Sequence, residues 1–151
     1  MLEVETLADM DARVGQPLGA GEWLQVTQQM IDRFAEATGD HQWIHVDTER
    51  AAREMPGGKT IAHGFLTLSL LPVLATTILR IKHRSRTLNY GANKIRFTSP
   101  VPVGSRLRLH QSLKASEPVE GGRRLIYEAT IEIEGQTRPA LVAETIQLAY
   151  D

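Results

Sequence analysis

Asp40 and His45 are the residues of this sequence whose types and spacing best suit chemistry. They lie in the short segment 39–47, which has the sequence GDHQWIHVD. A carboxylate and an imidazole on one short segment can share a water molecule, an arrangement suited to general acid-base catalysis. We therefore predict acid-base chemistry here, in a pocket that the rest of the chain must supply.

Helix signals flank this segment on both sides. Thr27 is a predicted N-cap, and the apolar positions that follow it recur at helical spacing: Met30, Ile31, Phe34 and Ala35. Gly39 can end this helix in the left-handed conformation. Asp47 is the predicted cap of a second short helix. The segment from Asp40 to His45 is thus expected to be a tight connection held at both ends.

The longest uncharged stretch spans residues 64–79. It is shorter than the about 20 apolar residues of a membrane span, and four hydroxyl residues and Pro72 interrupt it. Apolar residues occupy every face, which predicts a long helix surrounded by other structure. Pro72 is expected to bend this helix or to interrupt its hydrogen bonding.

The second half of the chain changes from helical to strand periodicity. Apolar and polar residues alternate over 106–110 and 125–134, as in half-buried antiparallel strands. Further strands are expected at 23–26, 93–98 and 141–150, with turns at 121–122 and 134–136. No repeat or linker divides the sequence. The fold class predicted is α+β, one domain over residues 1–151, with a curved antiparallel sheet wrapped around the apolar helix.

Composition argues against several classes of partner. The chain has 17 basic and 18 acidic residues, so nothing indicates binding to nucleic acid or to an anionic membrane. It has no cysteine, which excludes disulfides and thiolate metal sites. Its acidic start lacks the features of a secretory signal, and we expect a cytoplasmic protein.

Several motifs in order resemble those of a known family. The segment 40–47 is followed by TIAHGF at 60–65, NYGANKIRF at 89–97 and PVPVG at 100–104. Over about residues 21–149 the chain resembles the MaoC-like (R)-specific enoyl-CoA hydratases, in particular the nodulation-protein-N-like branch. The resemblance implies a single hotdog fold, a homodimer, and reversible hydration of trans-2-enoyl-CoA to (R)-3-hydroxyacyl-CoA. It implies no metal and no cofactor, since coenzyme A is part of the substrate.

The resemblance also assigns roles to residues. Asp40 and His45 would form the acid-base pair, and the backbone N–H of Gly64 would donate to the thioester oxygen as negative charge develops there. A glycine at a helix start suits that task, because its amide is unpaired and no side chain blocks approach. The residues expected to bind substrate are Gln42, Trp43, His63, Phe65, Tyr90 and Asn93.

Two positions depart from the family pattern, Gly-Asp-x-Asn-Pro-x-His-x-Asp. Gln42 and Trp43 replace its Asn and Pro, which affects loop geometry and substrate fit but leaves both catalytic positions in place. Some relatives also place a serine in the pocket from the central helix, where this chain has Pro72. That role is not transferred.

Each assignment has an alternative. Asp40 and His45 could belong to a solvated loop, or could bind a metal together with His41 and Asp47. His63 could only set the turn before Gly64, and Tyr90 and Asn93 could only serve their strand. The basic residues between 82 and 96 form either a solvated face or a contact for coenzyme A phosphates. For the whole chain, the alternatives are an acyl-CoA thioesterase and a non-catalytic acyl-CoA-binding module.

Overall fold

The computed structural model describes all residues, 1–151. Short elements occupy the first half of the chain and long strands the second. The helices are η1 (Ala8–Arg13), α1 (Gln28–Thr38), α2 (Trp43–Val46), α3 (Thr48–Glu54), η2 (Pro56–Gly58), α4 (Gly64–Ser69) and α5 (Leu71–Ala75). The strands are β1 (Leu2–Thr6), β2 (Pro17–Ala20), β3 (Leu24–Gln25), β4 (Leu79–His83), β5 (Arg86–Phe97), β6 (Arg106–Val119), β7 (Gly122–Ile133) and β8 (Leu141–Tyr150).

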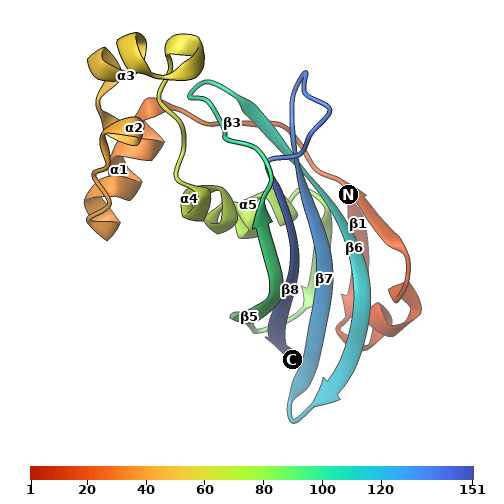
Figure 1. Ribbon diagram of the computed structural model, residues 1–151. Helices are drawn as coiled ribbons and strands as arrows, with labels where there is room; N and C mark the ends of the chain where they lie inside the picture. The colour runs from red at the N-terminus through yellow and green to blue at the C-terminus, as the bar shows by residue number, and fades with distance from the viewer.

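The main sheet is antiparallel and has the strand order β2-β6-β7-β8-β5, with β3 paired to β6. Figure 1 shows that this sheet curves around α4 and α5, while α1, α2 and α3 gather to one side, near the start of α4. This arrangement confirms the predicted α+β hotdog fold. A parallel pair, β1 and β4, was not expected from the sequence.

The expected strands are all present, several of them longer than predicted, whereas β1, β2 and β4 were not predicted. Strand β8 has the expected bounds, whereas β6 runs on to Val119 and β5 begins at Arg86. The extensions lie where strict alternation of apolar and polar residues breaks down. Register shifts in β5 and β6 disturb the period of two at those places.

The central helix is not the single long helix that the sequence predicts. It breaks at Leu70 into α4 and α5, and Pro72 occupies the first turn of α5. Proline is tolerated there because the amide of a first-turn residue needs no helical partner. The chain then turns into β4 at Leu79, so only part of the uncharged stretch is helical. No helix in the structure combines the length and apolar character needed to cross a membrane.

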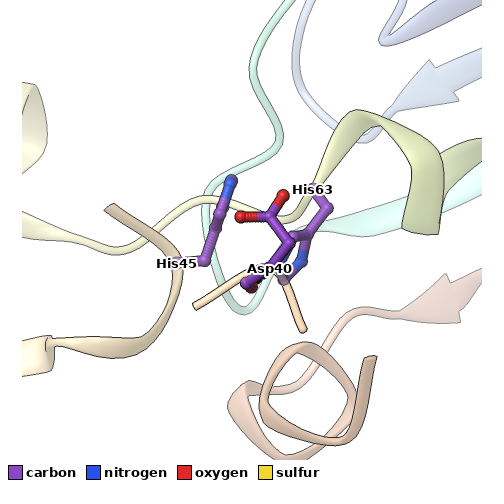
Figure 2. A group of neighbouring side chains, drawn as sticks. All are labelled: Asp40, His45 and His63. Carbon is purple, nitrogen blue, oxygen red and sulfur yellow. Dashed lines mark hydrogen bonds between the residues drawn. The ribbon is translucent and has the colours of Figure 1, made fainter. Parts of the chain in front are cut away.

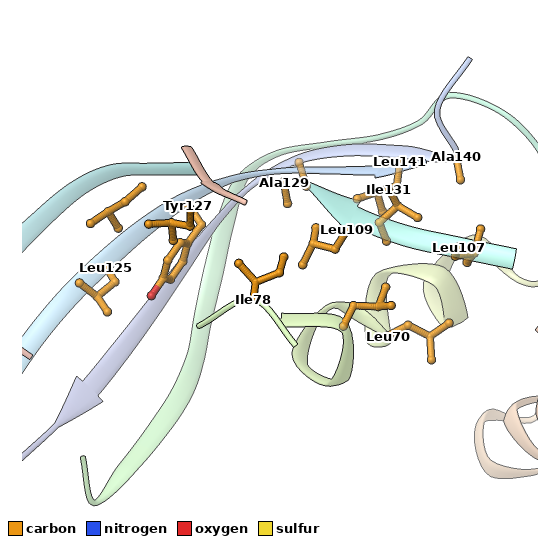
Figure 3. Packing of buried hydrophobic residues seen from close by; sticks show 14 of the residues in the cluster. Leu70, Ile78, Leu107, Leu109, Leu125, Tyr127, Ala129, Ile131, Ala140 and Leu141 are labelled. Carbon is orange, nitrogen blue, oxygen red and sulfur yellow. The ribbon is translucent and has the colours of Figure 1, made fainter. Parts of the chain in front are cut away.

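The core lies between the concave face of the sheet and these two helices. Figure 3 shows Leu107, Leu109 and Ile131 of the sheet on one side, with Leu70 and Ile78 facing them. The helices are not enclosed on all sides, as the sequence had suggested. Phe65 is 65% exposed and Val73 48% exposed, and both lie on the side turned away from the core.

Candidate active site

Asp40 is positioned by the end of α1. Thr27 caps the start of this helix by accepting a hydrogen bond from the amide of Met30, and Gly39 ends it with a φ of 80°. Both signals act as predicted. Asp40 is therefore the first residue after the helix, on backbone that is free to change direction.

His45 is positioned by α2, a one-turn helix that the sequence had not indicated. The side chain of Asp47 then caps α3 through the amide of Arg50, as expected. Because α2 turns the chain by one helical turn, it carries the His45 ring back toward Asp40 and leaves it 6% exposed.

The structure brings Asp40 and His45 together with a third residue, His63. One ligand-type atom from each side chain lies within 4.8 Å of the others. Figure 2 shows the carboxylate of Asp40 on the same side as a ring nitrogen of His45. No direct hydrogen bond joins the two side chains, and the spacing leaves room for one bridging water.

The surroundings of His45 define its protonation. Its Nδ1 lies 2.7 Å from the backbone oxygen of Ile61, which can only accept, so Nδ1 carries the proton. In the neutral ring, Nε2 is then the free acceptor. Burial lowers the pKa of His45, and the neighbouring His63 adds to this effect; the Ile61 hydrogen bond and the charge of Asp40 oppose it. His45 is therefore held in the neutral form that can accept a proton.

His63 contacts both His45 and Asp40. Its ring stacks on that of His45 with centroids 3.8 Å apart, and its other neighbour is Phe34, at 4.8 Å. Its Nε2 donates to the backbone oxygen of Asp40 at 2.9 Å. His63 therefore connects both members of the pair to the start of α4.

A carboxylate with two imidazoles is also a set that divalent metals bind. A metal ion lies close to the plane of each imidazole that binds it. The rings of His45 and His63 are stacked at 23°, so their lone pairs lie in nearly parallel planes, which is unfavourable for binding one shared ion. His41, which the sequence alternative included, is not in this group.

Gly64 begins α4 beside the same site. Together with His45 and Phe97 it lines a cavity of about 230 Å³. A Cβ on Gly64 would lie 3.0 Å from the ring of Phe97, so a side chain there would require the ring to shift by a few tenths of an ångström. The Gly64 amide has no hydrogen-bond partner within the chain, since it precedes the first helical hydrogen bond.

Comparison with known proteins identifies the family of this chain. The model of the MaoC-like domain matches residues 9–134. The chain is 48% identical over 147 residues to 3-hydroxyacyl-thioester dehydratase Z of Mycobacterium tuberculosis, covering 97% of each chain. It is 49% identical over 146 residues to nodulation protein N of Rhizobium leguminosarum bv. viciae, covering 95% of this chain and 90% of that one.

The chain belongs to the MaoC-like dehydratase family. This membership makes it a hydro-lyase and supports its place in the nodulation-protein-N-like branch. Among solved structures, the unliganded R-hydratase PhaJ1 of Pseudomonas aeruginosa superposes with a TM-score of 0.76 at 23% identity, covering 97% of this chain and 86% of that one. At this identity the likeness establishes the hotdog fold alone.

The other residues predicted to bind substrate lie at different places around Asp40 and His45. Gln42 is exposed at the N-cap of α2, and Trp43 packs under the guanidinium of Arg50, 4.0 Å from its ring centroid. Phe65 lies edge-on to Phe97, with ring centroids 5.6 Å apart. None of the three lines the cavity that contains His45.

Tyr90 and Asn93 are not brought to the site. Asn93 donates to the carboxylate of Glu144 at 2.7 Å, and Tyr90 is 60% exposed beneath Arg124. Both belong to β5 at the edge of the sheet. Their contacts fit the alternative in which these residues only serve their strand. We do not retain them in the site.

Two residues that support the site had no sequence signal. Gln28 donates to the backbone oxygen of His45 at 2.8 Å, and its own oxygen accepts from the hydroxyl of Thr60. These contacts connect α1, α2 and the segment before α4. Both residues are common surface types separated by 32 positions, and only the fold makes them neighbours.

The basic residues near β4 and β5 are largely on the surface. Lys82 pairs with Glu5, and Arg86 lies 4.4 Å from the ring centroid of Tyr150. Arg84 is different, because it lines a cavity on the concave side of the sheet. Most of this group therefore fits the solvated-face alternative.

Proposed function

We propose that this chain is an (R)-specific enoyl-CoA hydratase that reversibly hydrates trans-2-enoyl-CoA to (R)-3-hydroxyacyl-CoA. The observation that carries the proposal is the convergence of Asp40 and His45 beside the unpaired amide of Gly64. The relative named 3-hydroxyacyl-thioester dehydratase supports the same chemistry, because dehydration is the reverse of hydration.

The proposed reaction begins with a water held between Asp40 and His45. The free Nε2 of His45 suits removal of its proton, while the Asp40 carboxylate accepts the second hydrogen bond of the water. The water oxygen adds to the β carbon, and electrons move toward the thioester oxygen, where the amide of Gly64 can donate. The proton then returns to the α carbon, so that one water is added in total. No metal or organic cofactor is required by this scheme.

The acyl chain would lie beside α4 and α5. A cavity of about 420 Å³ separates these helices from β5 and β8, and its lining includes Leu68, Leu71, Ile95 and Ile146. Pro72 also lines it, at the position where some relatives have serine. The apolar lining is suited to the first carbons of an acyl chain.

We further propose that the chain acts as a homodimer joined through β5. This long strand is at the edge of the sheet, and exposed hydrophobic residues lie on it and on the neighbouring helices: Phe65, Val73, Leu88, Tyr90 and Phe97. An exposed apolar edge strand tends to pair with another chain. Pairing there would also cover the outer side of α4, next to the site.

The test is an assay with crotonyl-CoA and longer trans-2-enoyl-CoAs, with chiral analysis of the product. We expect loss of the conjugated enoyl absorbance, no release of free thiol, and an (R)-3-hydroxyacyl product. Release of thiol without hydration would instead indicate the thioesterase alternative. Saturable binding without turnover would indicate a binding module.

Asp40→Ala and His45→Ala should each lower kcat by the roughly 10² to 10⁴ expected for one acid-base group. Asp40→Ala should leave the melting temperature nearly unchanged, because Asp40 is exposed. His45→Ala should lower it, because the ring is buried and stacked; the sequence alone had suggested no change. Wild-type turnover in either variant would refute the catalytic pair.

A further inference from the structure

A row of polar side chains lies on the concave face of the sheet. The alternation of apolar and polar residues along the strands predicts apolar residues at these positions. On β6, Gln111 lies between Leu109 and Leu113 and is only 8% exposed. On β7, Tyr127 is 3% exposed, and Figure 3 shows its ring on the same side of the sheet as Leu125. Gln147 of β8 lies opposite Leu125, two residues from Tyr127 along β7, and opposite Asn89 of β5, so the polar row runs diagonally over the strands.

These side chains line a cavity that continues the proposed acyl site. The cavity has a volume of about 270 Å³ and includes Gln111, Tyr127, Thr87 and Arg84 in its lining. It shares Pro72, Asn89 and Gln147 with the larger cavity beside α4 and α5. The two cavities therefore adjoin each other, and the lining of the second is the more polar.

The polar groups at the far end lack partners within the chain. The buried hydroxyl of Thr87 has none, and the side chains of Gln111 and Gln147 form no hydrogen bond. Burial raises the pKa of Tyr127 and keeps its hydroxyl protonated, while the nearby charge of Arg84 acts in the opposite direction. Buried polar groups without partners are costly, and such groups usually have a role.

The charge at this end is positive. Arg84 is exposed at the cavity and forms no salt bridge in the structure, and no Asp or Glu is among the lining residues. Hydroxyl, amide and guanidinium groups without a nearby carboxylate favour an oxygen-bearing group, most of all an anionic one.

We propose that this cavity receives the distal end of the acyl chain and selects thioesters whose distal end carries an oxygen function, preferably a carboxylate. This inference rests on the proposed hydratase activity and specifies its substrate class. A methyl-ended chain of the same length would leave these polar groups buried and unpaired, which is the costly arrangement.

The test compares trans-2-enoyl-CoAs of increasing length, each made with a methyl, a hydroxyl or a carboxylate end. At the length that reaches the cavity, kcat/KM for the carboxylate-ended substrate should exceed that for the methyl-ended one by roughly tenfold to a hundredfold. Gln111→Leu and Tyr127→Phe should each reduce this ratio, and Arg84→Met should reduce it for carboxylate more than for hydroxyl. Gln136→Leu, in an exposed turn, is the matched control and should leave the ratio unchanged.

Thermal stability gives a second readout. Gln111→Leu should not lower the melting temperature, because the Gln111 amide forms no hydrogen bond within the chain that the change would remove. A drop would mean that Gln111 has a structural role, and would overturn the inference.

The outcomes separate this inference from the proposed function. Hydration of crotonyl-CoA, with a preference for methyl-ended substrates at every length, would overturn the polar cavity alone. An unchanged substrate ratio in Gln111→Leu would do the same. Failure to hydrate any enoyl-CoA would overturn both.

Discussion

At the scale of single residues, the chemistry depends on how His45 is held. The hydrogen bond to Ile61 defines its tautomer, and the stack with His63 defines its orientation. Both contacts come from the segment just before α4, and Gly64 is the first residue of α4. The proposed base and the proposed amide donor are thus supported by adjacent residues of the chain.

This environment predicts the pH dependence of the reaction. Because burial lowers the pKa of His45 below 6.5, its neutral form should persist to a more acidic pH than that of a free imidazole. Hydration should therefore be lost as pH falls through this lowered pKa, with the acidic limb of kcat/KM below pH 6.5. A pH profile of kcat/KM for crotonyl-CoA measures the limb, because kcat/KM reports the ionisation of the free enzyme.

Stability should change in the same direction. As pH falls, the unfolded chain binds a proton at His45 before the folded chain does. The stability that His45 contributes is therefore present above pH 6.5 and is lost as pH falls through the folded pKa.

Asp40→Asn is the control for the pH profile of activity. It removes a charge that raises the pKa of His45, so the acidic limb of its residual activity should move to lower pH. An acidic limb above pH 6.5 in the wild-type chain would contradict this account.

At the scale of elements, the join between the segment after η2 and α4 is the critical feature. Gly64 lies next to the ring of Phe97 of β5, with little room for a Cβ between them. The break at Leu70 lets α5 change direction relative to α4 over the same concave face. The Gly64 amide therefore lies at the start of a short helix packed on the sheet, and not at the start of one long helix.

Gly64→Ala tests this packing. The added methyl would lie 3.0 Å from the Phe97 ring, so α4 or the ring must move. We expect a loss of stability of about 1 to 3 kcal/mol, together with a fall in kcat/KM because the amide shifts. Thermal unfolding and the crotonyl-CoA assay measure the two effects.

The compensating variant is Gly64→Ala combined with Phe97→Leu. It makes room for the methyl group and should recover part of the kcat/KM lost in the single variant. If Gly64→Ala alone behaved as wild type in both measurements, the close approach of Gly64 and Phe97 would have no effect on stability or activity.

At the scale of the whole molecule, the chain leaves one side of its fold open. Strand β5 has a partner only on the β8 side, and Leu88 and Tyr90 on it are 50% and 60% exposed. The helices that form the site lie next to this edge. The proposed dimer would therefore complete the sheet and cover the site together.

Light scattering in solution tests the dimer. The wild-type chain should have twice the monomer mass, and the double variant Leu88→Lys, Tyr90→Lys should have the monomer mass, because charged residues on an edge strand oppose pairing. Val14→Lys replaces an exposed apolar residue outside β5 and should remain dimeric. A wild-type monomer at assay concentration would reject the dimer.

Features that depend on local interactions could be predicted from the sequence alone. Thr27, Gly39 and Asp47 cap or end helices through contacts within a few residues, and β8 was predicted with its observed bounds. The spacing of Asp40 and His45 together with the later motifs was also enough to indicate the family.

Features that depend on contacts between distant residues required the folded structure. The stack of His45 on His63, the packing of Phe97 beside Gly64 and the polar row through Gln111 join parts of the chain that are 16 or more positions apart. Pairing of strands and the placement of helices on them set such contacts, and no local propensity encodes them. Neighbouring residues were therefore enough to propose the chemistry, whereas the shape and polarity of the cavities required the fold.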